Sequence, residues 1–462
     1  MTQSHCLRKM VGSPLTRVPG AEALAFIKEA TIVIEDSSKK LRRREFLGAA
    51  AATAGFMILK PGLVRGTEAN SALRVGLLGC GGRGTADATD IVNTGKARVV
   101  ALADLFQDQL DKAKANFDTL LKSKGYAPVD PSLMFRGPKA YEEIANSKEV
   151  DVVVIATPPY FHPQHLEAVV LAGKHVYCEK PVAVDVHGAN RVLDSGRRAE
   201  GRLSLEVGFQ LRNAPPYVEQ VKRIHAGALG TIACGTGHYF ATFIDRPQWP
   251  GASPDEYRLR NWLYYRVLSG DIIVEQNIHV IDMCNWILQS HPAKATAAGG
   301  RKVRTDPGDV YGHYEVVYHY PQGINMTFNS TQFDKGWWDV GWRFFGSKGV
   351  SETHYSGPVA IYGEEAWKWD TAASPLHPES KEFSATGQFR DNLAQADPEK
   401  KKSFVESILS GNYHNQAAQG VESALSAMLG RMAAYTGQQV TWDGLLQTDE
   451  HWEDEIDLNQ FA

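Results

Sequence analysis

A glycine-rich loop between a short apolar run and a helical pattern constrains the fold of this chain more than any other feature. The run Leu73–Leu78 reads as a buried strand, and residues 79–84 follow it as GCGGRG, which fits the spacing G-x-G-x-x-G. A helical pattern continues from Thr85 to about Val92. The spacing alone is weak evidence in a chain with 42 glycines, but the strand before it and the helix after it indicate a dinucleotide-binding unit.

Each glycine of the loop has an expected task. Gly79 would make the tight turn, Gly81 would let the backbone approach a pyrophosphate, and Gly84 would let the helix pack closely on the strand. The helix N-terminus would present unpaired N–H groups and a positive dipole end to the phosphates. The expected cofactor-binding residues of the loop are Gly79, Gly81, Gly82, Arg83 and Gly84.

An acidic residue follows at the spacing that such a unit requires. The second predicted strand, Arg98–Ala103, ends at Asp104, 20 residues after Gly84. A carboxylate there accepts hydrogen bonds from both adenosine ribose hydroxyls and would repel a 2′-phosphate, which favours NAD over NADP as the cofactor. The alternative is that Asp104 only caps the next predicted helix, Gln107–Lys122.

Strands and helices alternate through the next hundred residues. The apolar run Asp151–Ala156 is typical of a parallel strand buried on both faces, and it is followed by a predicted helix, His162–Leu171, and a predicted strand, His175–Cys178. This alternation predicts an α/β fold with a doubly wound parallel sheet. Ligands bind at the carboxyl ends of such strands. Four candidate residues fall there: Gly79, Asp104, Thr157 and Lys180.

The motif Glu179-Lys180-Pro181, together with the glycine loop, the Thr157-Pro158 turn and His162, resembles the glucose–fructose oxidoreductase, inositol dehydrogenase and MocA family. The similarity extends over residues 73–450. It implies a Rossmann domain over residues 73–208 and an α+β substrate domain over 209–450, with an open, mostly antiparallel sheet and C-terminal helices that return to the first domain. Residues 451–462 would form a tail. The resemblance adds these cofactor contacts: Thr157, Pro158, His162, Glu179 and Lys180.

The resemblance also implies catalytic residues. Lys180 would lie beside the nicotinamide and the substrate hydroxyl, with a cis bond before Pro181. His279 matches the family's catalytic histidine, with Glu275 where the family usually has Asp and Asn277 where it usually has Gly. Glu275 and His279 are four residues apart, so on a continuous helix they would share a face and the carboxylate would orient the imidazole. Asp282, three residues on, is the alternative partner.

The second half of the chain shows period-2 patterns. Strands are expected over 231–244, 309–319, 324–331 and 340–346, a long loop over 372–398, and helices over 402–409 and 417–435. Aromatic residues crowd 239–265 and 337–342, and flat rings suit the C–H faces of a sugar or cyclitol, although any single ring is more often core. The expected substrate-binding residues are Gln210, Arg212, Trp262 and Asp282.

The first 72 residues differ from the rest and read as an export signal with a linker. They carry 11 Lys and Arg against 6 Asp and Glu, and the arginines 42–44 precede a 13-residue apolar run, Leu47–Leu59, which is too short to span a bilayer. The order Arg-Arg-x-Phe-Leu resembles a twin-arginine signal. An amphipathic helix is the alternative, and an uncleaved signal would serve as a membrane tether. Because that pathway carries folded proteins, the signal predicts a periplasmic or cell-envelope protein with a tightly held NAD.

Composition excludes several other classes of protein. The formal net charge of −4 gives no basic surface for nucleic acid, and the five cysteines lack the spacing of a metal site, so no metal is expected. The function predicted is hydride transfer from a sugar, glycoside or cyclitol to bound NAD, in a homodimer or homotetramer. The alternatives are an NAD-dependent enzyme that cleaves glycosides by transient oxidation and a sugar-binding protein without activity.

Overall fold

The computed structural model describes residues 72–244, 247–334, 337–370 and 391–462. Contacts divide the chain into two units, Met1–Val64 and Arg65–Ala462, and all described residues belong to the second. The predicted export signal and its arginines lie outside the described residues.

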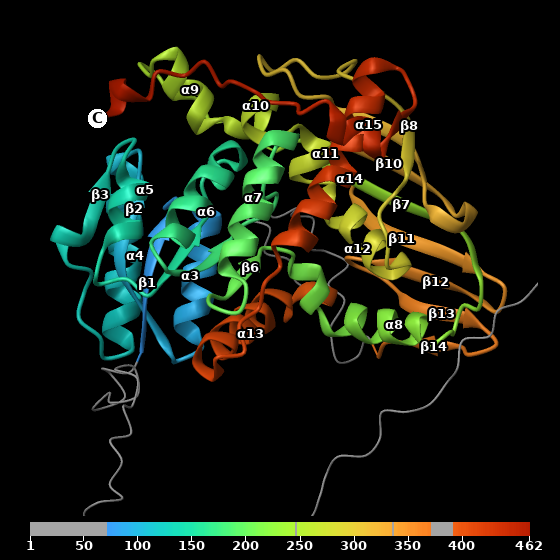
Figure 1. Cartoon of the computed structure of the whole chain (residues 1–462), viewed down its shortest axis with the longest axis horizontal. Helices are drawn as coiled ribbons and strands as arrows, with labels where there is room; N and C mark the ends of the chain where they lie inside the picture. The colour runs from blue at the N-terminus through green and yellow to red at the C-terminus, as the bar shows by residue number, and fades with distance from the viewer. Residues whose placement is uncertain (1–71, 245–246, 335–336, 371–390) are drawn as a thin grey trace, which may run out of the picture. The chain divides into compact units, whose positions relative to one another are not determined.

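The first sheet has six parallel strands in the order β3-β2-β1-β4-β5-β6 (Figure 1). Its strands are β1 (Leu73–Leu78), β2 (Ala97–Asp104), β3 (Met134–Arg136), β4 (Val152–Ile155), β5 (His175–Cys178) and β6 (Leu205–Val207). β4 is buried along its whole length, as its unbroken valine run predicts. From β1 the chain continues through β2 and β3 on one side, and then through β4, β5 and β6 on the other. This change of direction between β1 and β4 opens a crevice at the carboxyl ends of the strands. The doubly wound fold expected from the sequence is confirmed.

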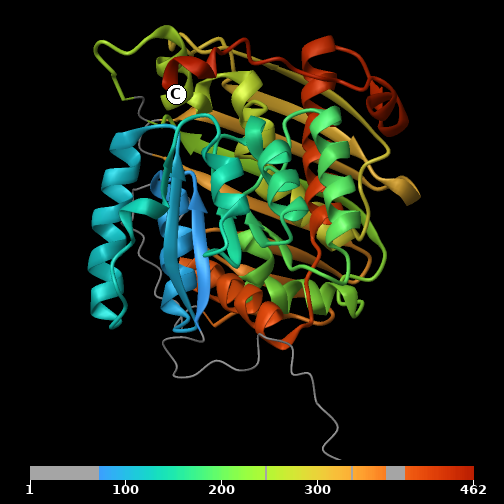
Figure 2. The same ribbon diagram turned by 60° about the vertical axis from the view of Figure 1, so that its left-hand side comes forward.

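Helices cover both faces of this sheet (Figures 1 and 2). On one face α3 (Gly82–Asn93), α4 (Gln107–Ser123) and α13 (Ala396–Ser410) pack on a shared apolar cluster. The helices of the other face are α5 (Ala140–Asn146), α6 (His162–Leu171) and α7 (Val186–Ala199). α13 and α14 (Ala417–Thr436) come from the end of the chain, so the last helices do return to the nucleotide-binding part.

The second sheet has nine strands in the order β14-β13-β12-β11-β7-β10-β9-β8-β15. Its strands are β7 (Ile232–Thr242), β8 (Lys294–Gly300), β9 (His313–His319), β10 (Asn325–Asp334), β11 (Asp339–Gly346), β12 (Gly349–His354), β13 (Val359–Gly363), β14 (Trp367–Lys368) and β15 (Val440–Thr441). The one parallel pairing in this sheet is β10 with β7. The open, mostly antiparallel sheet expected from the resemblance is therefore confirmed.

One face of the nine-stranded sheet is covered by α12 (Ile278–Leu288) and α14. Gly237 of β7 allows this packing, because a Cβ there would lie 2.8 Å from Cγ1 of Val280 on α12. Residues of β7, β9 and β10 alternate between buried and partly exposed, so the opposite face is the more open one. The other α-helices among the described residues are α8 (Pro215–His225), α9 (Pro254–Arg260), α10 (Arg266–Ser269), α11 (Ile272–Glu275) and α15 (Trp442–Gln447).

Several predicted boundaries were wrong. α3 begins at Gly82, because the glycine loop itself supplies the first helical turn. α13 begins at Ala396 instead of 402, so the last residues of the expected loop 372–398 are helical; residues 371–390 lie outside the described part. The first turns of α13 bury Asp397, Lys400 and Lys401, which a sequence pattern reads as polar surface.

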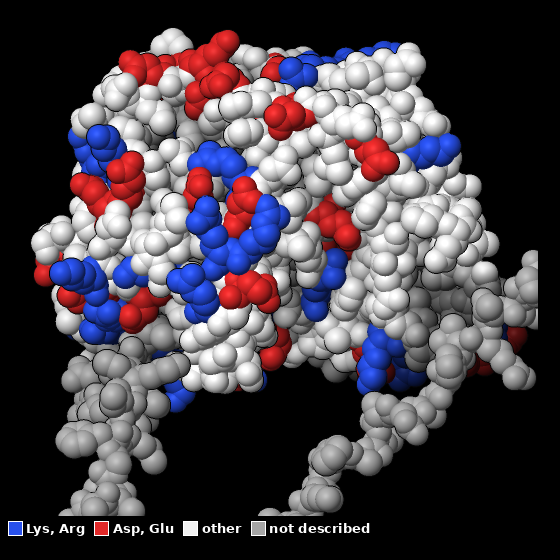
Figure 3. Space-filling model, viewed as in Figure 1, with Lys and Arg blue, Asp and Glu red and all other residues white. Residues whose placement is uncertain are grey.

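Acidic and basic side chains are interspersed on the face shown in Figure 3. The basic groups at its centre stand beside acidic ones. The described residues of this face therefore form no continuous basic track of the kind that binds nucleic acid.

Candidate active site

The glycine loop has the backbone geometry that a diphosphate requires. Gly79 has φ +93°, and a Cβ there would lie 2.6 Å from the carbonyl of Ala156. A Cβ on Gly84 would lie 2.2 Å from the carbonyl oxygen of Gly79, whereas one on Gly81 would meet nothing within 4 Å. Gly79 and Gly84 are thus packed against protein, and Gly81, at the N-cap of α3, faces open space. The loop fits a bound dinucleotide in the way expected from the sequence.

Asp104 lies at the end of β2 and borders the same space. Its Oδ2 accepts a hydrogen bond from the backbone N–H of Cys80 at 2.7 Å, and its Oδ1 accepts one from Phe106 at 2.9 Å. Phe106, not Asp104, is the N-cap of α4, so the alternative role as helix cap was wrong. Burial raises the pKa of the Asp104 carboxyl, and each carboxylate oxygen keeps a lone pair for a ribose hydroxyl.

The Asp104→Asn variant should lose affinity for NAD and lose discrimination against NADP. The substitution removes the charge that accepts the ribose hydroxyls and repels a 2′-phosphate, and hydrogen bonds to charged groups are worth roughly 1.5–3 kcal/mol, about a tenfold or larger effect. Calorimetric dissociation constants for both nucleotides would measure it. The exposed Asp111→Asn variant is the control, and an unchanged NAD preference in Asp104→Asn would refute the ribose role.

A cavity of about 250 Å³ lies above the carboxyl ends of β1, β2 and β4. Gly79, Gly81 and Asp104 line its floor, and Arg260 and Trp262 line it from the substrate half of the chain. Trp262, expected at the substrate, therefore borders the same cavity as the Asp104 carboxylate. Arg260 lies 3.9 Å from the ring centre of Phe106 and donates to Asp108 of α4 at 2.8 Å, so it ties α9 to the nucleotide half.

The last residues of the chain run over this cavity. In Figure 1 they pass from α15 across the top of the molecule to the C-terminus near α9. Leu458 lines the cavity, and the Gln460 amide donates to Asp255 of α9 at 2.9 Å. Ser253 donates to Gln460 at 2.7 Å, and the Arg136 guanidinium donates to the carbonyl of Ala462 at 3.1 Å. The expected tail is thus a segment bound to both halves, and it covers the cofactor space.

Lys180 and Glu275 meet beside the dinucleotide loop. Nζ of Lys180 donates to the backbone carbonyl of Glu275 at 2.6 Å and to its Oε1 at 2.9 Å. Both side chains are largely buried, with 12% and 14% of their surfaces exposed. The bond between Lys180 and Pro181 is cis, as the resemblance implied. The ammonium group is fixed at the end of β5, where it can donate to a substrate oxygen.

The expectation that Glu275 orients His279 on one helix face was wrong. α11 ends at Glu275 and α12 begins at Ile278, so the two residues do not share a continuous helix. His279 Nδ1 is buried and has no hydrogen-bond partner among the described residues. Burial, together with Lys180, keeps the pKa of His279 well below its ordinary value of 6.5, so the imidazole is neutral at physiological pH.

Asn277 lies in the break between α11 and α12. It is fully buried, and neither its amide nitrogen nor its amide oxygen has a partner among the described residues. Buried polar groups are nearly always hydrogen-bonded, so this unpartnered amide is unusual. In the sequence, Asn277 differs from the family only by standing where glycine is usual.

Arg212 and Asp282 pair with each other. Asp282 accepts two hydrogen bonds from the Arg212 guanidinium at 2.9 Å each and one from Ser423 at 2.7 Å. Asp282 is therefore not the partner of His279. Gln210 is buried at the start of a short turn after β6. The substrate roles assigned to these residues stay predictions.

The predicted aromatic group does not form one surface. Trp342, Tyr239 and Tyr264 are buried in the core. Trp249 and Trp262 instead line the cofactor cavity.

Thr157 and His162 connect the strand ends. The two nitrogens of His162 lie 2.7 Å from the carbonyl oxygens of Thr157 and Pro181, and the imidazole is buried. Thr157 and Pro158 line the cavity. His162 thus joins the turn after β4 to the turn that carries Lys180, and its expected contact with the cofactor stays a prediction.

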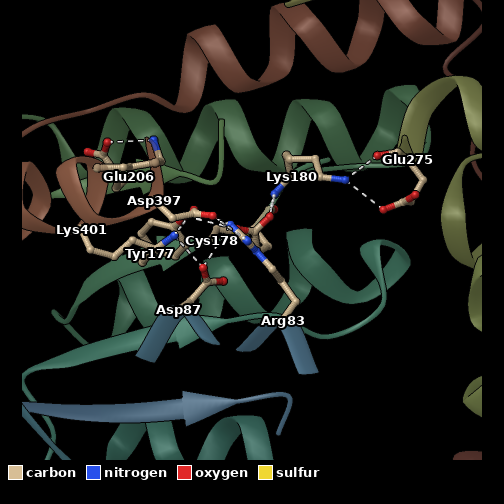
Figure 4. A network of polar contacts seen from close by, with 11 residues as sticks. Arg83, Asp87, Tyr177, Cys178, Lys180, Glu206, Glu275, Asp397 and Lys401 are labelled. Carbon is tan, nitrogen blue, oxygen red and sulfur yellow. Dashed lines mark hydrogen bonds and ion pairs between the residues drawn. The ribbon is translucent and has the colours of Figure 1, made fainter. Parts of the chain in front are cut away.

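A buried charge network lies on the other side of the Lys180 turn (Figure 4). Nη2 of Arg83 lies 3.0 Å from Glu179 Oε1 and 2.8 Å from Asp397 Oδ1. Nζ of Lys401 lies 2.5 Å from Asp397 and 2.7 Å from Asp87. Arg83 and Glu179, both expected at the cofactor, therefore bind each other, and Arg83 also binds Asp397 of α13.

The network positions the turn that carries Lys180. Oε2 of Glu179 accepts the backbone N–H of Lys180 at 3.1 Å, and Figure 4 shows the Lys180 side chain extended away from the network toward Glu275. Burial raises the pKa of Asp87 to about 7, against the effect of Arg83 and Lys401. Burial acts in the same direction on Asp397, but Lys401 and Arg83 outweigh it and hold that pKa below its usual range.

Fold and site together define an oxidoreductase with an NAD-binding Rossmann domain. The family description "Oxidoreductase family, NAD-binding Rossmann fold" matches residues 73–207, and the C-terminal domain of the same GFO/IDH/MocA family matches residues 217–352. The two matches cover more than half of the chain. The chain belongs to the GFO/IDH/MocA family, it is an oxidoreductase, and NAD is its cofactor.

Three relatives illustrate the similarity. An inositol 2-dehydrogenase of Rhizobium meliloti (strain 1021) is 26% identical over 292 residues, 63% of this chain and 78% of that protein. The aldose-aldose oxidoreductase of Caulobacter crescentus, in complex with glycerol, has a TM-score of 0.60 at 19% identity over 80% of this chain and 99% of that one. A levoglucosan dehydrogenase in complex with NADH and levoglucosan has a TM-score of 0.62 at 20% identity with the same coverage. At these identities the two structures establish the shared fold.

Proposed function

We propose that this oxidoreductase transfers hydride from a hydroxyl-bearing carbon of a sugar, glycoside or cyclitol to a tightly bound NAD. One observation carries the proposal: Lys180, held by Glu275 after the carboxyl end of β5, lies close enough to His279 to help keep that imidazole neutral. A hydrogen-bond donor beside a neutral base suits the oxidation of a hydroxyl-bearing carbon. The substrates in the names of the relatives, inositol and aldoses, support this class.

The residues of the site have distinct roles in this proposal. NAD, when bound, supplies the hydride acceptor. His279 is neutral and accepts the hydroxyl proton of the substrate, as a general base. Nζ of Lys180 donates a hydrogen bond to the same oxygen as negative charge develops on it, and Glu275 holds Nζ in place.

A substrate panel tests the proposal. The protein is purified without added nucleotide, and the near-ultraviolet absorbance of reduced nicotinamide is recorded on addition of sugars, cyclitols and aryl glycosides. Reduction of the bound cofactor by one compound class is expected. Aglycone release without net reduction would assign the glycoside-cleaving alternative, and binding of a sugar without either reaction would assign a sugar-binding protein.

The pH dependence of oxidation should reflect the low pKa of His279. The free enzyme keeps this base neutral at pH 6.5, because burial and Lys180 disfavour its protonation and lower its pKa. We expect kcat/KM to stay level down to pH 6.5 and to fall only at lower pH. The contrary result is a fall in kcat/KM toward acid pH with its midpoint above pH 6.5 that is absent in His279→Asn. It would contradict the assignment of His279 as a neutral base.

We propose further that the protein is exported folded with its NAD in place. The paired arginines and the short apolar run support export, and the chain segment over the cofactor cavity supports slow release of the cofactor. In the part of the chain that the structure describes, no helix has the length and apolarity to cross a membrane. A homodimer or homotetramer is part of this proposal, and sedimentation would measure it.

Replacing the twin arginines should block export. The Arg43→Lys plus Arg44→Lys variant is expected to stay in the cytoplasmic fraction while the unchanged chain reaches the envelope, because a twin-arginine signal depends on the pair. Cell fractionation with an antibody to the chain measures this. Export of the double variant at the original level would refute the twin-arginine assignment, and membrane association of the exported chain would identify an uncleaved tether.

A further inference from the structure

Two histidines and an aspartate converge on the open face of the nine-stranded sheet. Gly341 of β11 pairs with His238 of β7 on one side and with His354 of β12 on the other. Register partners point to the same face of a sheet, and Asp339, two residues before Gly341, points there as well. Three neighbouring strands therefore present three potential ligands to one place.

The three side chains are close together and within reach of solvent. Nε2 of His238 lies 2.8 Å from Oδ2 of Asp339, and Nδ1 of His354 lies 2.9 Å from Oδ1 of Asp339. One ligand atom from each residue lies within 4.8 Å of the other two. Their side chains are 21%, 29% and 17% exposed, in the order His238, Asp339, His354.

Gly341 makes room for this convergence. A Cβ at Gly341 would lie 3.2 Å from Cε1 of His238 and 3.1 Å from Nδ1 of His354, between the two imidazoles. Two further contacts orient the rings. Glu352 Oε1 lies 3.3 Å from Nε2 of His354, and Phe240 stacks on His238 with 5.2 Å between ring centres. A carboxylate on the second nitrogen of an imidazole is the usual support of a metal-binding histidine.

This cluster is separate from the candidate active site. Tyr239, the next residue after His238, is buried on the opposite face of β7. α12, which carries His279, packs on that opposite face. The sheet therefore lies between the cluster and His279.

We propose that His238, Asp339 and His354 bind a divalent transition-metal ion of the zinc class. Two neutral imidazoles and a carboxylate are ligands that Zn²⁺ favours, and three protein ligands leave a position for water or another donor. The ion replaces the hydrogen bonds that now join Asp339 to the two histidines and links β7, β11 and β12. The sequence predicts no metal because the ligands are spread over three strands, without any short spacing.

The purified full-length chain is first treated with a chelator to remove bound metal. Titration with Zn²⁺, and separately with Co²⁺, then tests the proposal. Calorimetry is expected to find one more bound equivalent in the unchanged chain than in His238→Ala or His354→Ala. Loss of a ligand should weaken this site by more than about 100-fold, since even outer-shell partners contribute roughly 10–100-fold. For Co²⁺, the absorption spectrum should change on filling the site.

Two control variants lie on the same face. His319 bonds to Asn325 and not to a carboxylate, and His319→Ala should bind as the unchanged chain does. Cys234 is exposed on β7, four residues or about 13 Å from His238, and Cys234→Ser should leave this equivalent in place.

NAD binding reports whether the variants are folded, because the cofactor cavity lies elsewhere. If either histidine variant fails this check, Asp339→Asn serves instead, since it keeps the shape and removes the charge. Equal stoichiometry and affinity for both ions in the unchanged chain and in the folded variants would overturn the proposal. A site that survives these variants and is lost in Cys234→Ser would overturn it as well.

Discussion

Replacing Lys180 by Met is expected to lower kcat by about 10²–10³-fold, the usual cost of removing one donor to a developing oxyanion. The Nζ group is held by two hydrogen bonds to Glu275, so in the unchanged protein it is positioned before the substrate binds. NAD affinity should change little, because the glycine loop and Asp104 are intact. Steady-state kinetics with the responding substrate and calorimetry with NAD measure the two effects.

The exposed Lys148→Met variant controls for loss of a positive charge elsewhere. Lys180→Gln keeps a hydrogen-bond donor without the charge, and its activity should lie between that of the unchanged protein and that of Lys180→Met. If Lys180→Met kept full kcat with correctly bound NAD, the catalytic assignment of Lys180 would be wrong. A fall in NAD affinity alone would make Lys180 a cofactor-binding residue only.

Replacing Lys401 by Met is expected to lower the free energy of unfolding by about 3–5 kcal/mol, because it leaves the buried carboxylates of Asp87 and Asp397 with one cation, Arg83, in place of two. The Lys401 side chain has no exposed surface, and it contacts Asp397 and Asp87. Its loss also frees Arg83 and Glu179 to move, so kcat should fall as well through the turn that carries Lys180. Denaturant unfolding and substrate kinetics measure the two consequences.

The neighbouring lysine provides a matched control. Lys402 is 58% exposed and lies 3.9 Å from Glu399, so Lys402→Met should change stability by no more than about 0.5 kcal/mol. Equal free energies of unfolding for the Lys401 and Lys402 variants would contradict this prediction. They would show that the packing of a buried methionine stabilises the protein as much as the ion pairs of Lys401 do.

The sequence predicted the nucleotide-binding half well because its strands are buried on both faces and read as apolar runs. Leu73–Leu78, His162–Leu171 and His175–Cys178 match the observed elements to the residue. The antiparallel half was harder. The short strands β12, β13 and β14 are half-exposed, and β8, which reads KATAAGG, has no apolar alternation to detect.

Prediction of the site succeeded where residues follow strand ends and failed where side chains meet through tertiary contacts. Gly79, Asp104 and Thr157 line one cavity, and Lys180 follows the end of the neighbouring strand β5, because parallel strands end at one edge. The pairing of Glu275 with His279 assumed a continuous helix, which the break at Gln276 and Asn277 interrupts.

Other contacts left no local signal in the sequence. Asp397 and Lys401 lie in a run that reads as a solvated helix start, and only their contacts with Arg83 and Asp87 of α3 show that they are internal. The cluster of His238, Asp339 and His354 likewise exists only once three strands are paired.

Transfer of deuterium to the bound nicotinamide tests the central claim most directly. A substrate that reduces the cofactor is labelled with deuterium at each ring carbon in turn. The reduced cofactor is extracted, and its mass is measured by mass spectrometry. The account predicts one position whose deuterium appears in the cofactor, with Lys180→Met slowing its transfer. Reduced cofactor that stays unlabelled at every position, or a protein that binds NAD and never reduces it with any compound of the panel, would contradict hydride transfer at this site.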